Sequence, residues 1–554
     1  MRSRWMGVTT VCLVWGMLVS GCGWIEGGLG EKKEAKSAKE DRQELHITIA
    51  SEPPSLDSAI AVDGSSFNVL NNVMEGLMRL DMANQVQPAI SDGMPEISPD
   101  KKTITFKIRE GAKWSDGVPV KAQDFEYAWK RALNPNFNLE SAVMLFDIEN
   151  AQAYHTGQAP EEAVGVKALD DRTLQVKLRQ PSPYFLGQTA SAAFLPQRKD
   201  IVEKYGKEYG SDKEKMVYNG PFVLAEWNHE QNLRYKKNDQ YWDKKSVKLE
   251  QVHVKVDTDP VNIMNGYTSG KTDVAPLSKE LVDAFKGGSE FLPVERGATF
   301  LLVYNTRLEF LKNKKIRQAL SLAVDREQLV NEVMKDGSRP AKGMVPDGID
   351  DGNGDPFRKD AGKLVDFDKE KASRLLEEGI DELGYETLPT VELNVNDDDR
   401  KKIALFLKNE WKNNLGLNVT INPKPVKQKL AAEQQGYFHL SLVRWIGRYN
   451  DPMAFMEIGH SASQVNFGKW HNPAFDRLIE KAKSTSDFKA RNEAMVKAEE
   501  IVMEDAGVAP LFYESQAYVQ KPYVKNLFRH PIGPEYTLKW TYIEGKEQQK
   551  KKKK

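Results

Sequence analysis

The sequence predicts an α/β protein made of more than one compact unit. Stretches in which apolar and polar residues alternate are interleaved with stretches in which apolar residues recur every three or four positions. The first pattern is typical of half-buried strands and the second of amphipathic helices. Their alternation along the chain favours α/β lobes over a sandwich or a helical bundle. The chain has 554 residues, which is more than a single hydrophobic core can hold. We therefore expect two or three units.

We call the part of the chain that begins at Leu45 the body. Its first half contains two strands, a turn and a helix. Residues 45–49 (LHITI) and 103–108 (TITFKI) alternate as strands do. Residues 115–117 (SDG) have the composition of a turn. Apolar residues recur at helical spacing over residues 125–133, and Pro135 predicts that the helix ends before it.

The second half continues the alternation of strands and helices. Apolar residues at helical spacing over residues 316–323, 403–411 and 494–501 predict three more helices. Residues 417–421 (LNVTI) alternate as a strand does, and an apolar segment, residues 508–513, follows the last helix. The pattern is therefore that of α/β lobes over the whole length of the body.

The composition excludes several classes of protein. With 40% hydrophobic and 29% charged residues the chain is globular, and a net charge of −1 gives no basis for nucleic-acid binding. The only cysteines are Cys12 and Cys22. The body therefore has no disulfide, no cysteine-based zinc site and no cysteine nucleophile. A body without thiols suits a protein exported to an oxidising compartment.

The sequence motifs of catalysis and metal binding are absent or incomplete. There is no P-loop, GxGxxG or HExxH sequence. Residues 459–463 (GHSAS) lack the last glycine of a nucleophile elbow, and we interpret them as a polar loop. Residues 351–355 (DGNGD) are similar to a calcium loop, but Pro356 and Gly362 stand where an EF-hand needs its glycine and its glutamate. We therefore expect a binding protein without cofactor or metal, and not an enzyme.

The two ends of the chain have distinct features. Two arginines precede an apolar run, residues 5–19, which as a helix would rise about 22 Å, short of the roughly 30 Å hydrocarbon core. The run ends in Leu-Val-Ser-Gly before Cys22, and this resembles the lipobox of bacterial lipoproteins. We expect residues 1–21 to be a signal peptide and residues 22–44 a lipid anchor with a flexible linker. Residues 544–554 form a Lys-rich tail whose last five lysines we expect to be disordered; a weak attraction to anionic lipid is the alternative.

Six segments of the body carry a resemblance to a known family. They are residues 51–57 (SEPPSLD), 105–135 (TFKIREGAKWSDGVPVKAQDFEYAWKRALNP), 219–243 (NGPFVLAEWNHEQNLRYKKNDQYWD), 315–330 (KIRQALSLAVDREQLV), 445–455 (WIGRYNDPMAF) and 472–482 (NPAFDRLIEKA). Each resembles the oligopeptide- and dipeptide-binding lipoproteins of bacterial ABC importers, solute-binding protein family 5. The six segments occur in the same order as in that family, and they come after a lipobox.

This resemblance implies a two-lobed periplasmic-binding-protein fold, type II and cluster C, whose lobes close about a hinge over a buried ligand. Lobe I would comprise residues 45–64, 196–297 and 517–543, and lobe II residues 298–516, with an extra domain, residues 65–195, packed on lobe I. In such a fold main-chain hydrogen bonds hold an extended peptide whatever its sequence, and water fills roomy side-chain pockets.

The resemblance also implies which residues contact the ligand. Glu52 matches an acidic residue that lines the ligand cleft. Arg400 and Arg444 lie near positions from which relatives bind a ligand carboxylate, and an ordinary surface position is the alternative for each. The remaining contacts follow the pattern Trp-x-x-Asp-Tyr-x-x-Pro, which Pro452 completes, and they are Trp445, Ile446, Gly447, Arg448, Tyr449 and Asn450.

Three positions depart from the family pattern. Val426 stands where relatives often have a Trp beside a side-chain pocket, and Lys121 replaces a helix-capping Thr. Arg448 replaces the Asp that pairs with the ligand's α-amino group in peptide binders. An ammonium about 4 Å from a guanidinium would be repelled by roughly 4 kcal/mol at an effective dielectric constant near 20.

Three explanations of Arg448 stay open. The ligand has an anionic or blocked end, or its amine meets another acid such as Glu52, or Arg448 points to solvent while the loop repacks.

We therefore expect an extracytoplasmic lipoprotein that captures oligopeptides between two lobes and delivers them to the permease subunits of an ABC transporter. It would be a monomer held through lipidated Cys22 on the outer face of the cell membrane, or on the periplasmic side if an outer membrane exists. One alternative is the same fold with an anionic, N-blocked or non-peptide ligand, and another is a sensor, adhesion or chaperone lipoprotein. A hydrolase is disfavoured because the sequence offers neither a nucleophile set nor a metal set.

Overall fold

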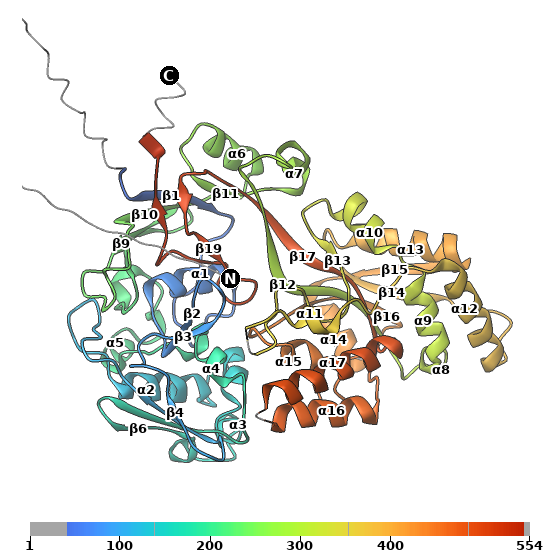
Figure 1. The fold of residues 1–554 in the computed structure, drawn as a ribbon, viewed down its shortest axis with the longest axis horizontal. Helices are drawn as coiled ribbons and strands as arrows, with labels where there is room; N and C mark the ends of the chain where they lie inside the picture. The colour runs from blue at the N-terminus through green and yellow to red at the C-terminus, as the bar shows by residue number, and fades with distance from the viewer. Residues whose placement is uncertain (1–40, 138, 353, 486, 548–554) are drawn as a thin grey trace, which may run out of the picture. The chain divides into compact units, whose positions relative to one another are not determined.

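The computed structural model describes residues 41–137, 139–352, 354–485 and 487–547. Within these residues the largest element is an eleven-stranded sheet, drawn in Figure 1. Ten strands follow one another, and β13 (Arg339–Pro340) pairs with β17 off that path. In sheet order the ten are β15 (Val419–Lys424), β14 (Val391–Asn396), β16 (Leu440–Ile446), β12 (Phe291–Tyr304), β17 (Val508–Gln520), β11 (Val274–Pro276), β1 (Glu44–Ile49), β10 (Gln251–Val256), β9 (Asn232–Lys237) and β8 (Phe222–Asn228).

The buried hydrophobic residues are grouped into separate cores. One core draws on residues 45–274 and 523–543. Two others draw on residues 300–512, together with Ile532 from the C-terminal part of the chain. A small fourth core includes residues of α6 (Pro260–Thr268) and α7 (Lys279–Phe285). This grouping agrees with two lobes. The boundaries of lobes I and II stay a prediction, and so does the separation of residues 65–195 as an extra domain.

Two long antiparallel strands, β12 and β17, connect the cores of the two lobes (Figure 1). Their pairing is interrupted between Glu295 and Thr299. Gly297 lies in this interruption, where an added Cβ would collide with the side chain of Ile532. Because an irregularity in the ladder bends and twists a strand locally, the crossing between the lobes is one of the points at which the sheet departs from regular geometry.

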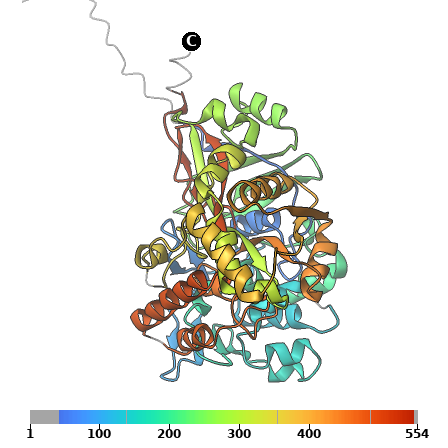
Figure 2. The same cartoon turned by 90° about the vertical axis from the view of Figure 1, so that its right-hand side faces the viewer.

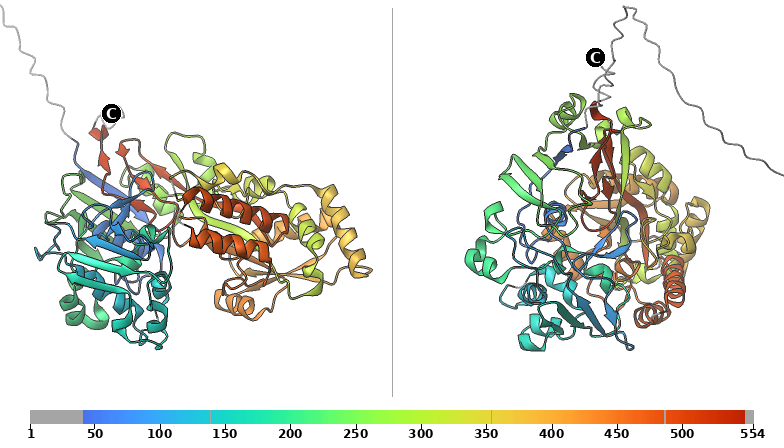
Figure 3. Two further views of the ribbon diagram at one scale, coloured as in Figure 1. Left: turned by 60° about the horizontal axis from the view of Figure 1, so that its bottom comes forward. Right: turned by 60° about the vertical axis from the view of Figure 1, so that its left-hand side comes forward.

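Helices cover both faces of the sheet in lobe II. Phe300, Leu302 and Tyr304 of β12 share one core with α9 (Lys314–Leu322), α12 (Lys369–Leu383) and α13 (Lys401–Leu415). Leu301 and Val303 share the other core with α15 (Met453–Met456), α16 (Pro473–Ser484) and α17 (Phe488–Glu504). Side chains alternate between the faces of a strand, so an uninterrupted apolar run fills two cores. Figure 2 views lobe II from its outer side, and Figure 3 shows α16 and α17 side by side.

Lobe I is associated with a second, four-stranded sheet, which α2 covers. The strand order is β4 (Glu96–Ile97), β5 (Thr103–Lys107), β7 (Thr173–Lys177) and β6 (Val166–Asp170). Helix α2 (Ala122–Leu133) buries Phe125 and Trp129, and the Trp129 indole donates to the carbonyl oxygen of Phe194 at 3.0 Å. The backbone N–H of Lys121 donates to the Asp124 carboxylate at 2.9 Å. This bond stabilises the start of the helix, although Lys121 replaces a capping Thr.

The remaining α-helices and strands of the described chain are short. They are α1 (Gly64–Val73), β2 (Met78–Leu80), β3 (Val86–Pro88), α3 (Ala151–His155), α4 (Phe185–Gln188), α5 (Lys199–Tyr205), α8 (Glu309–Lys312), α10 (Arg326–Gln328), α11 (Phe357–Ala361), α14 (Val426–Gln435), β18 (Val524–Lys525), β19 (Phe528–Arg529), β20 (Tyr536–Thr537) and β21 (Tyr542–Ile543).

The strands and helices expected from the sequence are confirmed, with ends that shift by a few residues. The early ones correspond to β1, β5 and α2, and the later ones to α9, α13, β15, α17 and the first half of β17. The proposed signal peptide, Cys22 and the five terminal lysines lie outside the described residues. In the described ranges, every helix is too short or too polar to cross a membrane.

The two ends of the described chain are hydrogen-bonded to each other. The Asp41 carboxylate accepts from the backbone N–H groups of Gly545 at 2.6 Å and Glu547 at 2.9 Å. The Gln43 side chain accepts from the N–H of Ile543 and donates to its carbonyl oxygen, both at 3.0 Å. The chain therefore enters and leaves the body at one place, next to β1, which pairs in parallel with β10.

Candidate functional site

A cavity of about 650 Å³, which we call the cleft, lies where the two lobes meet. One side is lined by residues 61–79, which include α1 and β2, and by residues of the segments 141–144 and 190–195, most of them in the expected extra domain. Lobe II contributes the end of β16, and residues 296–298 and 531–534 line the cleft between the two sides. A smaller cavity of about 270 Å³ shares Ala190, Ser191 and Arg448 with the cleft. The two cavities are therefore adjacent, and Arg448 lines both.

The backbone approaches itself closely at the centre of the cleft. β16 pairs with β12 up to the pair Ile446 and Ala298, and the N–H of Gly447 then donates to the carbonyl oxygen of Gly297 at 2.9 Å. A Cβ on Gly447 would lie 2.6 Å from Cδ1 of Ile532. Only glycine fits there, and its small size lets the chain turn so that the next side chain, that of Arg448, lies at the cleft.

Arg448 is exposed, and among the residues that the structure describes no carboxylate lies within ion-pair distance of it. The charge of Arg448 acts on the Glu457 carboxyl. Burial raises the pKa of the Glu457 carboxyl, and the charge of Arg448 is the largest of the effects that oppose this rise. The guanidinium of Arg448 is thus free to meet a ligand.

Arg444 also lines the cleft, but its guanidinium is engaged. It projects from β16 toward β17, where its Nε lies 3.0 Å from both carboxylate oxygens of Glu514. Arg444, which the resemblance gave as a possible ligand contact, therefore lies at the cleft. Its ion pair with Glu514 uses part of the guanidinium that would otherwise bind a ligand carboxylate.

Trp445, Tyr449 and Asn450 fix the loop rather than line the cleft. Trp445 donates from its indole to the carbonyl oxygen of Ala454 at 2.8 Å. Tyr449 stacks on Tyr184 with ring centroids 4.7 Å apart, and Asn450 accepts from the N–H of Asp350 at 3.2 Å. Tyr449 and Asn450 line the smaller cavity. The sequence pattern therefore contains both residues at the cleft and residues that support the loop.

Glu52, Arg400 and Val426 lie away from the residues that line these two cavities. The Glu52 carboxylate accepts from the Trp227 indole at 2.5 Å, from His229 Nδ1 at 2.6 Å and from the Glu230 backbone N–H at 2.6 Å. Arg400 precedes α13 and lies 3.5 Å from Asp398. Val426 is exposed at the start of α14. A contact of any of them with ligand stays a prediction.

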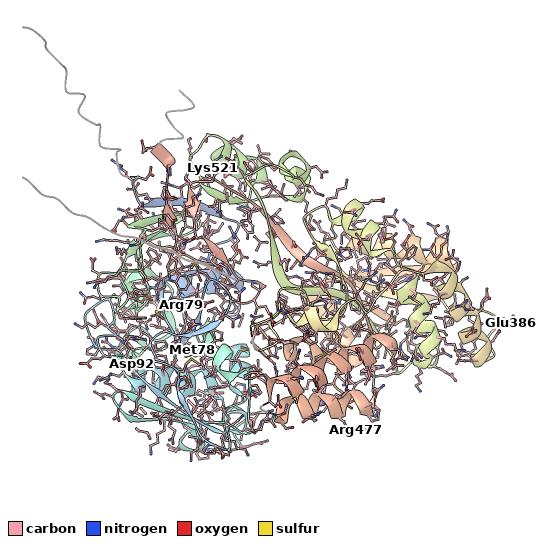
Figure 4. All side chains as sticks on the ribbon, in the orientation of Figure 1. Met78, Arg79, Asp92, Glu386, Arg477 and Lys521 are labelled. Carbon is pink, nitrogen blue, oxygen red and sulfur yellow. The ribbon has the colours of Figure 1, made fainter. Side chains whose placement is uncertain are left out.

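Two further arginines at the cleft were not expected from the sequence, Arg79 and Arg296. Arg79, labelled in Figure 4, donates to the Glu75 carboxylate at 2.6 Å, and Arg296 lies 2.7 Å from Glu535. Glu75 also accepts from Tyr241 and Trp242, both at 2.5 Å. No signal in the sequence points to Arg79, because Glu75 follows α1 and Arg79 lies in β2, and a spacing of four positions indicates a contact only within a helix.

The lining of the cleft is therefore rich in arginine. It includes Arg79, Arg296, Arg444 and Arg448, and the only carboxylate among its described residues is that of Glu75. Both oxygens of Glu75 already accept hydrogen bonds inside the protein, and Arg79, Arg296 and Arg444 are each paired with a glutamate. The charged group that the cleft offers to a ligand is therefore the guanidinium of Arg448.

The polar loop expected at residues 459–463 contains a Ser–His contact without the geometry of a catalytic triad. The Ser461 hydroxyl lies 2.6 Å from His471 Nδ1, and the same nitrogen lies 3.5 Å from Asp476. A triad needs the serine and the acid on opposite ring nitrogens. In the described ranges, no group of three or more His, Cys, Asp or Glu residues is arranged to hold a metal.

Comparison with known proteins gives a consistent result over nearly the whole chain. The family model described as bacterial extracellular solute-binding proteins, family 5 middle, matches residues 85–467. The dipeptide-binding protein DppE of Bacillus subtilis (strain 168) is 34% identical over 95% of this chain and 98% of its own length.

Solved structures agree with these matches. The substrate-binding domain of an oligopeptide ABC transporter from Bacillus anthracis is 38% identical, with a TM-score of 0.73, over 91% of this chain and 99% of that one. The periplasmic murein tripeptide-binding protein MppA of Escherichia coli, in its unliganded open form, is 29% identical, with a TM-score of 0.78, over 91% of this chain and 98% of that one.

Proposed function

The chain belongs to family 5 of the bacterial extracellular solute-binding proteins, and on this basis we propose that it captures oligopeptides in the cleft and delivers them to the permease subunits of an ABC importer. The observation that carries the proposal is the cleft itself, about 650 Å³ at the meeting of two lobes. Residues 296–298 and 531–534 line it, and Val62, Val143 and Ile446 are apolar side chains exposed along it.

This lining suits an extended peptide of variable sequence. In the binding mode of this family, main-chain hydrogen bonds hold the peptide and do not depend on its side chains. Exposed apolar residues and water fill the space around the ligand's side chains. The protein therefore recognises the form of the ligand more than its sequence.

The arginine-rich lining favours a second candidate within the same fold, a peptide or peptide-like ligand with an anionic or blocked end. Arg448 has no ion-pair partner among the described residues, and the Glu52 carboxylate is already held by three donors. Of the three explanations of Arg448, these contacts support a ligand that brings a negative or neutral group to the guanidinium.

Titration calorimetry with one tetrapeptide and its N-acetylated form tests both candidates. We expect the wild type to bind the acetylated peptide more tightly than the free-amine peptide. Arg448→Asp should improve binding of the free-amine peptide at least about tenfold, because an attraction replaces a repulsion. Arg477→Asp is the matched control: it makes the same change of charge at an exposed position of α16, labelled in Figure 4, and should leave both affinities unchanged.

Two results would contradict these proposals in different ways. Tight wild-type binding of the free-amine peptide, weakened by acetylation and by Arg448→Asp, would show that another acid holds the amine. Absence of binding of both peptides to the wild type and to both variants would contradict a peptide ligand.

We also propose that Cys22 anchors the protein to the outer face of the cell membrane through a lipid, as the lipobox indicates. Cys22→Ala should leave a folded body that no longer fractionates with membranes. The measurement is immunoblotting of membrane and soluble fractions after a high-salt wash, with Cys12→Ala, in the apolar run, as the control that stays membrane-bound. A Cys22→Ala protein that remains with the membranes would show that something else holds it there.

A further inference from the structure

A third cavity, of about 150 Å³, lies inside lobe I beside the strands that cross between the lobes. Its wall includes residues of β1, α1, β11 and β17 and the segment around β19 and β20. It adjoins the cleft through one ion pair, since Arg296 lines the cleft and its partner Glu535 lines the third cavity. Nothing in the proposed capture of peptides makes use of this cavity.

Arg529 in the wall of this cavity has hydrogen-bond donors without acceptors. Its Nε and Nη1 atoms are fully buried and have no partner among the described residues. Its guanidinium lies over the ring of Tyr518 at 3.6 Å. That contact stabilises the cation but leaves its in-plane N–H groups unsatisfied.

The charges around Arg529 do not balance. Glu535, the other charged residue that lines the cavity, lies 2.7 Å from Arg296 and accepts from the Tyr518 hydroxyl at 2.9 Å. Two guanidinium groups thus share one carboxylate, and the surplus positive charge is buried. Burial lowers the pKa of the Arg529 guanidinium, and neighbouring groups offset this only in part. A buried cation of this kind is costly unless an anion accompanies it.

Two serines at the solvent-exposed side of the cavity offer further donors. The hydroxyl groups of Ser51 and Ser65 both line the cavity and lie 2.6 Å apart. One hydrogen bond between them uses one of the two protons, so one hydroxyl proton remains to be donated. Ile47, Val69 and Val274 supply apolar walls, which limit the space to a small ion.

From these contacts we propose that the third cavity is a binding site for a small monovalent anion, a halide or a small carboxylate, held by Arg529 and the Ser51–Ser65 pair. The ion neutralises the surplus charge of the Arg296, Arg529 and Glu535 cluster. Because β12 carries Arg296 and β17 carries Tyr518, the site lies against both crossing strands, and its occupancy stabilises the junction of the lobes.

Bromide is the probe for the position of the site. Crystals of the full chain, grown in sodium bromide, should show an anomalous scattering peak in the third cavity beside Arg529. Bromide peaks confined to the protein surface, with none in this cavity, would overturn the proposal.

Thermal unfolding at constant ionic strength gives the second measurement. Replacing gluconate, which is too large for the cavity, by chloride or by formate should raise the wild-type unfolding temperature saturably by about 1–2 °C. Arg529→Gln should abolish the rise, and Arg477→Gln, at an exposed position, should keep it. A rise for formate but not chloride would restrict the site to carboxylates. An equal rise in wild type and Arg529→Gln would overturn the proposal.

Discussion

Among single residues, Asp273 connects three parts of the chain through one buried carboxylate. It accepts from the backbone N–H of His46 in β1 at 2.8 Å, from the Tyr523 hydroxyl at 2.7 Å and from Lys546 at 3.0 Å. Burial alone would raise its pKa, but the hydrogen bonds from His46 and Tyr523 and the charge of Lys546 lower it to about 2. The ionised form of Asp273 is therefore part of the folded structure.

We predict that this carboxylate stabilises the fold above pH 4 and loses its effect in acid. Since the pKa is lowered from 3.8 to about 2 in the folded state, the stabilisation is complete above the unfolded value and disappears as the pH falls through about 2. It amounts to about 2 kcal/mol. Urea unfolding from pH 5 to pH 2 should show a shallower loss of stability for Asp273→Asn than for the wild type.

Asp92→Asn is the control for this experiment, because the Asp92 side chain is half exposed and its ion pairs with Arg109 and Arg172 are 3.5 and 3.9 Å long. It should follow the wild-type pH dependence. A wild-type profile that coincides with that of Asp273→Asn would contradict the assignment.

The single residues of the site could be predicted only in part. The sequence pattern led to Arg448, Ile446 and Gly447, and the structure brings all three to the cleft. It could not indicate that Glu52 is held by Trp227 and His229, which are about 175 positions away along the chain. Nor could it indicate that Arg444 meets Glu514 on β17. Such pairs depend on strand pairing between distant segments, which periodicity does not encode.

At the scale of elements, α17 holds the loop that carries Arg448. Arg491 of α17 is buried and lies 2.7 Å from Asp451, which is also buried. The same Asp451 oxygen accepts from the N–H of Met453 at the start of α15. One carboxylate therefore ties the loop of residues 447–452 to two helices of lobe II.

We predict that Asp451→Ala destabilises the protein by about 3 kcal/mol, because it leaves the Arg491 guanidinium buried without its partner. The double variant Asp451→Leu with Arg491→Met should recover most of the loss, since it removes both charges. Urea unfolding of the single and double variants measures both effects.

An exposed ion pair provides the comparison for Asp451. Asp355 and Lys359 lie 3.2 Å apart with side chains 59% and 64% exposed, so Asp355→Ala should change stability by about 0.5 kcal/mol or less. Equal effects of Asp451→Ala and Asp355→Ala would show that the buried pair does not hold the loop.

The helices and strands are the part of the structure that could best be predicted from the sequence. Helical spacing located α2, α9, α13 and α17, and alternation located β1, β5 and β15. These patterns are local and follow from which face of each element is buried. The pairing of β12 with β17 is different in kind, because residues more than 200 positions apart form the ladder, and no local pattern indicates which strands meet.

For the whole molecule, the lobes are expected to close on ligand. The fold has a higher TM-score against an unliganded open form, 0.78, than against the more similar sequence from Bacillus anthracis, 0.73. We predict that a bound peptide reduces the radius of gyration and raises the unfolding temperature, since closure buries the ligand and mass action favours the bound state.

Small-angle scattering and calorimetry on the same samples test this closure. A peptide known from titration to bind should change both measurements, whereas a non-binding peptide of the same composition should change neither. Scattering curves that do not change with a bound peptide would show that capture occurs without closure.

The two-lobed form could be predicted from the sequence only through the family resemblance. Length and alternation indicate several α/β units, and the cores in residues 45–274 and 300–512 agree with that. The return of Ile532 into a core of lobe II, beside Gly447, has no counterpart in any local pattern. It depends on the C-terminal segment crossing back to the junction of the lobes.

The joined ends of the body also have a mechanical consequence. A pull on residue 41 is transmitted first to the bonds of Asp41 and then along β1, which lies parallel to β10 over six residue pairs. Such a ladder is loaded in shear, so its hydrogen bonds share the force instead of opening one after another. A body held at this point therefore bears tension first through the pair of strands β1 and β10 in lobe I.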